Sequence, residues 1–322
     1  MGTPTKSIIF GSVSVLFLAL LLIFPAWGQV QNARPAQPGA INYVEGQASI
    51  GGQQLNPGSV GSVGLENGQT LTTQTGKVEI LLTPGVFLRV DNNSVVKMIS
   101  PDLANTEAEI DKGRAMVEAT DISKNNNIRI DENGASVQLL KNGLYDFDAN
   151  HNEIRVFKGK AEVHANNQKV SLGDNREVAL NTSGKLKPQS FDTKQYADEF
   201  YRWSGLRSGY LAEADADVAR LYVNGGPGWN GSGWYWDPGF GAYTFLPGDG
   251  IFYSPFGWGF YSPFAFYGSP YFYGGGFYGG PHRFGDFHGP YGHGFEPRGG
   301  FGGGGFRGGG GGGFHGGGGG RR

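Results

Sequence analysis

Between residues 41 and 180, apolar residues recur in short runs that Gly, Asn and Asp separate. Runs at 77–82 and 86–90 flank Thr83-Pro84-Gly85, which predicts a β-hairpin. Strands of about five residues at regular spacing, with no long helical period between them, predict an all-β fold. We expect a single β-sandwich or roll, or an irregular β-solenoid, of about 10–12 short strands. The further predicted strands cover residues 94–99, 114–119, 127–130, 135–140, 144–147, 153–157, 160–164, 169–172 and 176–180.

The start of the chain carries an export pattern. A short basic stretch precedes an apolar run at 8–24, and the small residues Ala26 and Gly28 stand at the −3 and −1 positions of a cleavage site. This predicts a signal peptide over residues 1–28 that is cut before Gln29. The alternative is an uncleaved inner-membrane anchor, because a run of about 17 residues is at the short limit for a bilayer span. In both cases the remaining chain is expected to face an extracytoplasmic space.

A succession of Gly-led motifs runs through the predicted β region. The motifs are VEGQASI at 44–50, LENGQTLTTQTGKVEILLTPGVFLRVDNNSVVKM at 65–98, IDKGRAMVEA at 110–119, NGLYDFD at 142–148, IRVFKGKAEVH at 154–164 and VSLGDNREVAL at 170–180. In this order they resemble the FecR-type periplasmic domain, over about residues 42–182. The resemblance implies an all-β periplasmic domain that binds or relays a signal and has no catalytic residues.

The resemblance does not extend to a complete ferric-citrate regulator. In such a regulator, a cytoplasmic domain that grips a sigma factor precedes a membrane span. Here, residues 1–7 precede the apolar run, so we expect no cytoplasmic anti-sigma part.

Residues 186–224 are predicted as a helical connector. Asp192 is expected to cap the first helix, and Gly205 to end or kink it before a second helix over 210–221. Three aromatic residues share one face of the first helix: Tyr196, Phe200 and Trp203. We expect Trp203 to pack back on the β domain, since short helices need tertiary support; the alternative is a docking helix for a partner.

Residues 225–322 hold most of the chain's 59 glycines and most of its aromatic residues, and contain no lysine. With only two branched aliphatic residues there, Leu246 and Ile251, a conventional core cannot offset the conformational entropy of glycine. We therefore predict an aromatic, Ser-Pro-Phe/Tyr-rich segment at 225–273 and a Gly-rich, largely disordered tail at 274–322. Exposed rings at this density predict a contact surface for envelope polysaccharide, the outer membrane or another copy. The candidate contact aromatics are Trp234, Trp236, Tyr243, Phe256, Trp258 and Phe264.

Composition and motifs exclude several classes of function. A formal net charge of −2 and a pI near 6.3 argue against a nucleic-acid partner. The absence of cysteine excludes disulfides, a thiol nucleophile and thiolate zinc sites. No nucleophile elbow, phosphate loop or His-Glu-x-x-His stretch occurs. We therefore expect no cofactor, no metal site and no enzymatic activity.

One stretch has the spacing of a calcium loop, with Asp148, Asn150 and Asn152 at its first, third and fifth positions. Glu153 stands where such a loop requires Gly, so a hairpin turn is the better interpretation. Asp146 and Asp148 share a strand face and are expected at a solvated strand end.

The predicted organisation is a signal peptide at 1–28, a linker at 29–41, a FecR-like β domain at 42–185, then the connector, the aromatic segment and the tail. The first hypothesis is a non-enzymatic envelope protein in which the β domain is a binding or scaffold module and the tail is adhesive. The alternative is a periplasmic sensory or regulatory module that relays a signal to a membrane partner. A third, an unrecognised glycan-active enzyme, would require an essential carboxylate.

Overall fold

The computed structural model describes residue 2 and residues 36–180, 185–223 and 229–267. All of these belong to one compact unit, Met1–Gly276. The predicted cleavage-site residues Ala26, Gly28 and Gln29 and the tail at 274–322 lie outside the described residues. No helix in the described ranges is both long and apolar enough to cross a membrane.

The described residues are mostly β-strands, as predicted. The elements of the β domain are β1 (Ile41–Ile50), β2 (Gln53–Gln54), η1 (Pro57–Ser59), β3 (Thr70–Thr83), β4 (Val86–Val90), β5 (Val95–Pro101), β6 (Asn105–Lys112), β7 (Arg114–Ala119), β8 (Asn127–Glu132), β9 (Ala135–Leu139), β10 (Gly143–Asp148), β11 (Glu153–Lys158), β12 (Ala161–Ala165), β13 (Gln168–Leu172), β14 (Arg176–Ala179) and β15 (Gln189–Ser190). They are followed by η2 (Thr193–Tyr196), α1 (Glu199–Tyr222), β16 (Gly233–Asp237), β17 (Ala242–Leu246), β18 (Ile251–Tyr253), β19 (Gly259–Tyr261) and α2 (Pro263–Tyr267).

The β domain is one 15-stranded sheet with the order β13-β12-β9-β8-β6-β5-β3-β4-β7-β10-β11-β14-β15, to which β1 and β2 add beside β3. β6 and β8 are parallel, whereas the other neighbours along this order are antiparallel. The long strand β3 pairs with β5 through its first residues and with β4 through its last. It thereby divides the sheet into a first arm, from β5 to β13, and a second arm, from β4 to β15.

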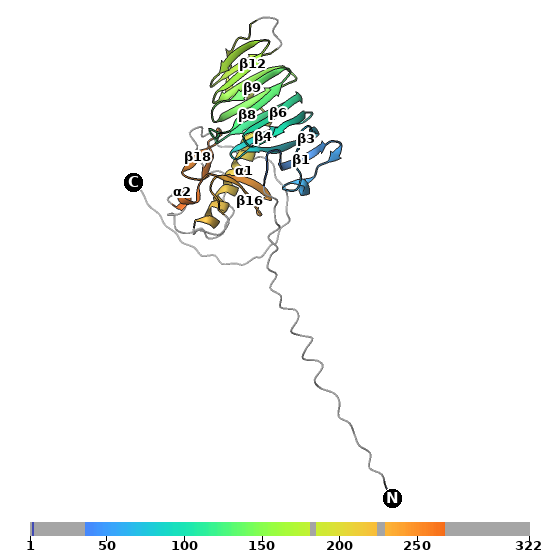
Figure 1. Ribbon diagram of the computed structural model, residues 1–322, viewed down its shortest axis with the longest axis vertical. Coiled ribbons are helices and arrows are strands. Elements are labelled where there is room, and N and C mark those ends of the chain that lie inside the picture. The colour runs from blue at the N-terminus through green and yellow to red at the C-terminus, as the bar shows by residue number, and fades with distance from the viewer. Residues whose placement is uncertain (1, 3–35, 181–184, 224–228, 268–322) are drawn as a thin grey trace, which may run out of the picture. The chain divides into compact units, whose positions relative to one another are not determined.

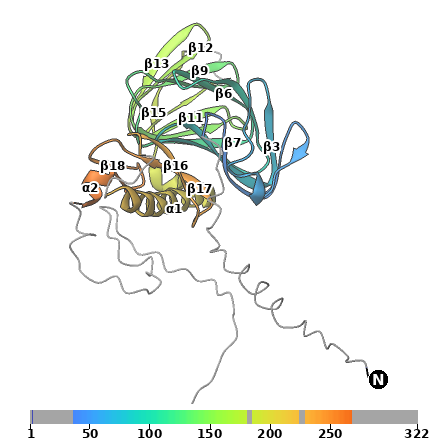
Figure 2. The ribbon, with the colours of Figure 1, turned by 60° about the horizontal axis from the view of Figure 1, so that its bottom comes forward.

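The two arms pack against each other around one apolar core. Ile130 and Val137 from one arm lie in the same buried cluster as Val117, Phe147 and Ile154 from the other. Figure 2 shows the sheet folded over on itself. The expectation of a single all-β sandwich or roll is therefore confirmed.

Four strands of the second arm, β4, β7, β10 and β11, are buried on both faces. Strand β4 illustrates how this burial arises. All five residues of β4 are buried. Val86, Leu88 and Val90 enter the core between the arms, whereas Phe87 packs with Leu211 of α1 on the outer face. Since side chains alternate along a strand, Arg89 lies on the same outer face as Phe87.

We call residues 198–223 and 229–267 the C-terminal cap: it contains α1, the β16–β17 and β18–β19 hairpins and α2 (Figure 1). The single helix α1 corrects the prediction of two helices. Asp198 is its N-cap, and Asp192 caps the short η2 instead. Gly205 lies inside the helix instead of ending it, and a Cβ there would be 3.2 Å from the Phe256 ring.

The prediction that Trp203 packs back on the β domain is confirmed. Its Nε1 donates a hydrogen bond of 3.1 Å to Glu45 of β1. Its ring lies 6.2 Å from that of Tyr43, and Lys77 Nζ is 5.9 Å from the ring centre. The start of α1 is thus fixed to the β1–β3 edge.

Candidate functional site

A row of mostly charged residues crosses six neighbouring strands on the outer face of the sheet. Each residue lies directly opposite the next, so all of their side chains share one face. The signs alternate from strand to strand, except at the methionine. In order, the row is Glu79, Arg89, Met116, Asp146, Arg155 and Glu177.

The first part of this row is sealed beneath α1. Arg89 pairs with Glu79 at 2.9 Å and with Glu118, and all three side chains have no exposed surface. From α1, Arg207 Nη2 donates to Glu79 at 2.9 Å and the Ser208 hydroxyl donates to Glu118 at 2.6 Å. Two guanidinium groups thus face two carboxylates, and we call these five residues the buried ion cluster.

The carboxylate of Glu79 is held ionised. Burial alone would raise the pKa of Glu79, but Arg207 and Arg89 lower it by more, so the net shift is downward. A buried carboxylate is tolerated where opposite charges and hydrogen bonds compensate for lost water.

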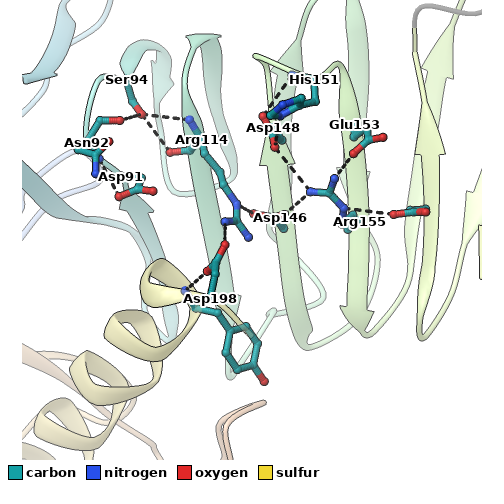
Figure 3. Close-up of polar contacts among 12 residues, drawn as sticks. Asp91, Asn92, Ser94, Arg114, Asp146, Asp148, His151, Glu153, Arg155 and Asp198 are labelled. Carbon is teal, nitrogen blue, oxygen red and sulfur yellow. Dashed lines mark hydrogen bonds and ion pairs between the residues drawn. The ribbon is translucent and has the colours of Figure 1, made fainter. Parts of the chain in front are cut away.

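The second part of the row, from Asp146 to Glu177, lies near the start of α1, where the polar groups around it reach the solvent. Asp146 accepts hydrogen bonds from Arg114 Nε at 2.7 Å and from Arg155 Nη1 at 2.9 Å. Arg114 also donates to Asp198, the N-cap of α1 (Figure 3). Burial lowers the pKa of Arg114, but Asp146 and Asp198 raise it by more. One guanidinium therefore connects the sheet to the first turn of the helix.

Arg155 pairs with more carboxylates than its single positive charge can neutralise. Its guanidinium is within 4.0 Å of four of them: Asp146, Asp148, Glu153 and Glu177. It also lies 4.2 Å above the ring centre of Tyr196, just before α1. Arg155 is therefore fixed from several sides, and negative charge exceeds positive charge around it.

Arg114, Arg155 and several of their partners line a pocket of about 530 Å³, which we call the charged pocket. Its walls come from the β4–β5 turn, the β10–β11 turn, β7, β11 and the residues at the start of α1. Burial raises the pKa of Asp91, which forms part of one wall. The lining residues are Asp91, Asn92, Asn93, Arg114, Asp148, Asn150, His151, Glu153, Arg155, Tyr196 and Asp198. Such a surface can bind a polar ligand or peptide segment through hydrogen bonds and ion pairs.

His151 stands at the rim of this pocket, and its side chain is 72% exposed. Its Nδ1 lies 2.8 Å from Asp148 Oδ2. The hairpin turn predicted at 148–152 is confirmed, because β10 and β11 are paired and Asn152 takes the left-handed backbone conformation, with φ 56°. Across the described part of the chain, no three His, Cys, Asp or Glu residues are placed to hold a metal ion.

The expectation of a solvated strand end at Asp146 is wrong. Asp146 has no exposed surface and is bound by two arginines. Arg114 is 32 residues away in the sequence and Arg155 is 9 residues away. The sequence did contain a signal for this burial, namely arginines within otherwise apolar strands. An arginine buried in such a strand requires a buried carboxylate partner.

The candidate contact aromatics that we predicted are part of the folded cap. Tyr243 is buried and Phe264 is 69% exposed, whereas Trp234, Trp236, Phe256 and Trp258 are partly buried. The Trp258 Nε1 donates to the Gly205 carbonyl at 3.1 Å. The expectation of exposed rings thus holds for Phe264 and fails for Tyr243, whose ring packs in the cap. None of the six belongs to the charged pocket.

Residues 69–162 match the model of the family described as FecR protein. This chain therefore contains a FecR domain. The matched residues include the sheet side of the buried ion cluster and both pocket arginines, whereas α1 and the rest of the cap follow them.

Two crystal structures of a proposed anti-sigma factor from Parabacteroides distasonis, at 2.50 and 1.65 Å resolution, are similar to this chain. Both are 16% identical to it, with TM-scores of 0.35 and 0.34. The similarity covers 39% of this chain and 61% of the other, so this chain spans less than two thirds of its length. No curated protein matches the chain.

Proposed function

We propose that this chain is an exported, non-enzymatic regulatory module of the bacterial cell envelope. In this proposal the FecR domain binds a ligand or partner segment at the charged pocket and relays the event to a membrane regulator. The observation that carries the proposal is the link between Arg114 and Asp198. The pocket is lined partly by the FecR domain and partly by the start of α1, so its occupant contacts both.

The state of the charged groups favours binding over turnover. Arg155 is engaged by four carboxylates, and His151 is bound to Asp148. An occupant that takes a hydrogen bond from Arg114 or donates one to Asp198 competes with the link between them. That competition changes the capping of α1, which gives binding a structural consequence in the cap.

A cross-linking experiment tests this function at the pocket. A photoreactive amino acid replaces His151 at the rim, and in a second strain it replaces His164 on β12. The two are matched, because His164 is also exposed and its Nε2 lies 2.7 Å from Glu162. We expect position 151 to cross-link to an inner-membrane protein and position 164 not to do so. Equal cross-linking at both positions, or none at either, would overturn the proposal.

Export is tested separately by the intact mass of the protein from fractionated cells. A mass that begins at Gln29 indicates cleavage after Gly28, and a mass that includes the first residues in the inner-membrane fraction indicates an anchor. Recovery of the full-length protein in the cytoplasm contradicts export.

For the Gly- and aromatic-rich tail we retain the proposal of contact with envelope polysaccharide, the outer membrane or another copy. Its basis is composition alone. Deletion of residues 274–322 is expected to release the protein from the envelope fraction. Unchanged retention and unchanged glycan binding would contradict the adhesive role without affecting the pocket.

A further inference from the structure

Asp215 lies in the middle of α1 and has no exposed surface. Its Oδ2 accepts a hydrogen bond of 2.6 Å from the backbone N–H of Tyr261 in β19. Its Oδ1 is also buried and has no hydrogen-bond partner. The carboxyl group of Asp215 thus joins the helix to the β18–β19 hairpin through one of its two oxygens.

The surroundings of Asp215 are apolar. Neighbouring residues of α1 pack with β17 and α2 in one buried cluster: Val218, Ala219, Leu246 and Phe266. Within two turns of Asp215 on α1, the titratable and charged groups are Tyr210, Glu213, Asp217, Arg220 and Tyr222. The strands packed against α1 add Tyr235 and Asp237 of β16, Tyr243 of β17 and Tyr261 of β19. Arg220 pairs with Asp217 at the surface. Among the ion pairs of the described residues, none includes Asp215.

This environment contrasts with that of Glu79, which is also fully buried beneath α1. Glu79 has two guanidinium groups to stabilise its charge, and its pKa is lowered. Asp215 has one backbone N–H and no cation, and burial raises its pKa well above the usual range. A buried carboxyl without a counter-ion is far less costly when it carries a proton.

We propose that the contact between α1 and the β18–β19 hairpin is a proton-operated latch, closed while Asp215 is protonated and weakened when Asp215 ionises. The protonated group still offers an oxygen to the Tyr261 N–H. When the proton leaves, the same apolar site must hold a full charge, and the hairpin can relieve this cost by moving away and admitting water.

The latch has a defined consequence for the cap. The β18–β19 hairpin carries Phe256 and Trp258 against Gly205 and Gly209 of α1. It also brings the Ser254 hydroxyl within 3.1 Å of Ser208, which binds Glu118 in the buried ion cluster. Opening the hairpin therefore uncovers one side of that cluster. The inference goes beyond the proposed function, because it depends on pH and on no ligand.

Hydrogen–deuterium exchange of the whole chain tests the latch. Exchange of residues 251–261, corrected for intrinsic amide rates, is measured from pH 5 to pH 9. We expect protection of this segment to fall as pH rises, by up to about tenfold per pH unit in the range where Asp215 changes its charge. The β4 segment provides an internal reference that does not lose protection in parallel.

Two variants make the test specific. In Asp215→Asn the side chain cannot ionise, and we expect hairpin protection that no longer depends on pH. In the matched control Asp237→Asn the pH dependence should persist, because Asp237 is also buried but accepts two backbone N–H bonds, from Gly239 and Phe240. A wild-type profile that is flat with pH overturns the proposal, whether or not either variant folds. So does an unchanged pH dependence in Asp215→Asn.

Discussion

Glu79 on β3 and Arg89 on β4 lie directly opposite each other and form a salt bridge of 2.9 Å from which water is completely excluded. A pair of this kind gains from Coulomb attraction and loses from desolvation, so its additional partners decide the balance. Here one of those partners, Arg207, comes from α1, more than a hundred residues later. The sheet and the cap thus form one electrostatic unit.

Removing Arg207 should strongly destabilise the protein. Arg207→Ala leaves the fully buried Glu79 with one cation instead of two and with fewer hydrogen bonds. Loss of one partner of a buried ion pair costs about 3–5 kcal/mol. The free energy of unfolding, measured with urea, should fall by that amount.

The matched control is Arg220→Ala in the same helix. Arg220 pairs with Asp217, and both side chains are largely exposed. An exposed pair contributes about 0–1 kcal/mol. Equal losses in the two variants would contradict the role assigned to the buried ion cluster.

Replacing Glu132 by glutamine should stabilise the protein at neutral pH. Both carboxyl oxygens of Glu132 are buried without a hydrogen-bond partner. Burial, with further contributions from Asp146 and Asp148, raises its pKa to about 8. Because the folded form holds its proton more tightly than the unfolded form, wild-type stability decreases as pH rises from the usual glutamate pKa to about 8.

Glutamine does not ionise, so the gain from Glu132→Gln should grow between about pH 5 and pH 8, reach about 3 kcal/mol near pH 7, and then level off. Thermal unfolding at several pH values measures it. Glu162→Gln, at a partly exposed position, is the control, since the pKa of Glu162 is lowered by Lys169 and His164 and its replacement should give no such gain. A gain from Glu132→Gln that is constant with pH would rule out the assigned cause.

The N-cap of α1 should contribute more to the stability of the protein than an ordinary helix N-cap does. Asp198 accepts the Tyr201 N–H and also pairs with Arg114. Asp198→Ala should cost about 1–2 kcal/mol and should increase amide exchange in the first turn of α1. The comparison is Asp192→Ala, since Asp192 caps only the short η2 through the Lys194 N–H. A larger loss from Asp192→Ala would be inconsistent with the link between pocket and helix.

Gly113 should tolerate no side chain. Its φ is 84°, and an added Cβ would lie 2.1 Å from the Ser94 hydroxyl oxygen, which accepts the Arg114 N–H. Gly134 provides the control, because its φ is 78° but nothing lies within 4 Å of its added Cβ. Gly134→Ala should cost about 1 kcal/mol from backbone strain alone, and Gly113→Ala clearly more. Similar melting temperatures for the two variants would contradict this packing.

The strands of the β domain are predictable because the short apolar runs and the turn residues between them are local features of the sequence. The hairpin around Pro84 and the turn at 148–152 follow from residue types within a few positions. The burial of Arg89 and Asp146 is not predictable in this way, since their partners and cover come from distant strands and from α1.

The helix shows a second limit of sequence reasoning. Glycine normally weakens a helix, which suggested an interruption at Gly205. In the structure, Gly205 and Gly209 instead make room for the Phe256 and Trp258 rings, whose approach no local pattern encodes. The charged pocket escaped prediction for a similar reason, because its walls come from four separate stretches of the chain.

The burial of β4 on both faces has a consequence for synthesis. The chain grows from its N-terminus, so the FecR domain is complete before the segment that becomes α1 has emerged. During that interval, Phe87 and Arg89 face water on the uncovered side of the sheet. The arrival of Arg207 and Ser208 then removes water from the ion pairs and closes the apolar surface in the same event. The cap therefore docks after the FecR domain. A nascent chain stalled before residue 208 would expose a hydrophobic and charged face of the sheet to chaperones.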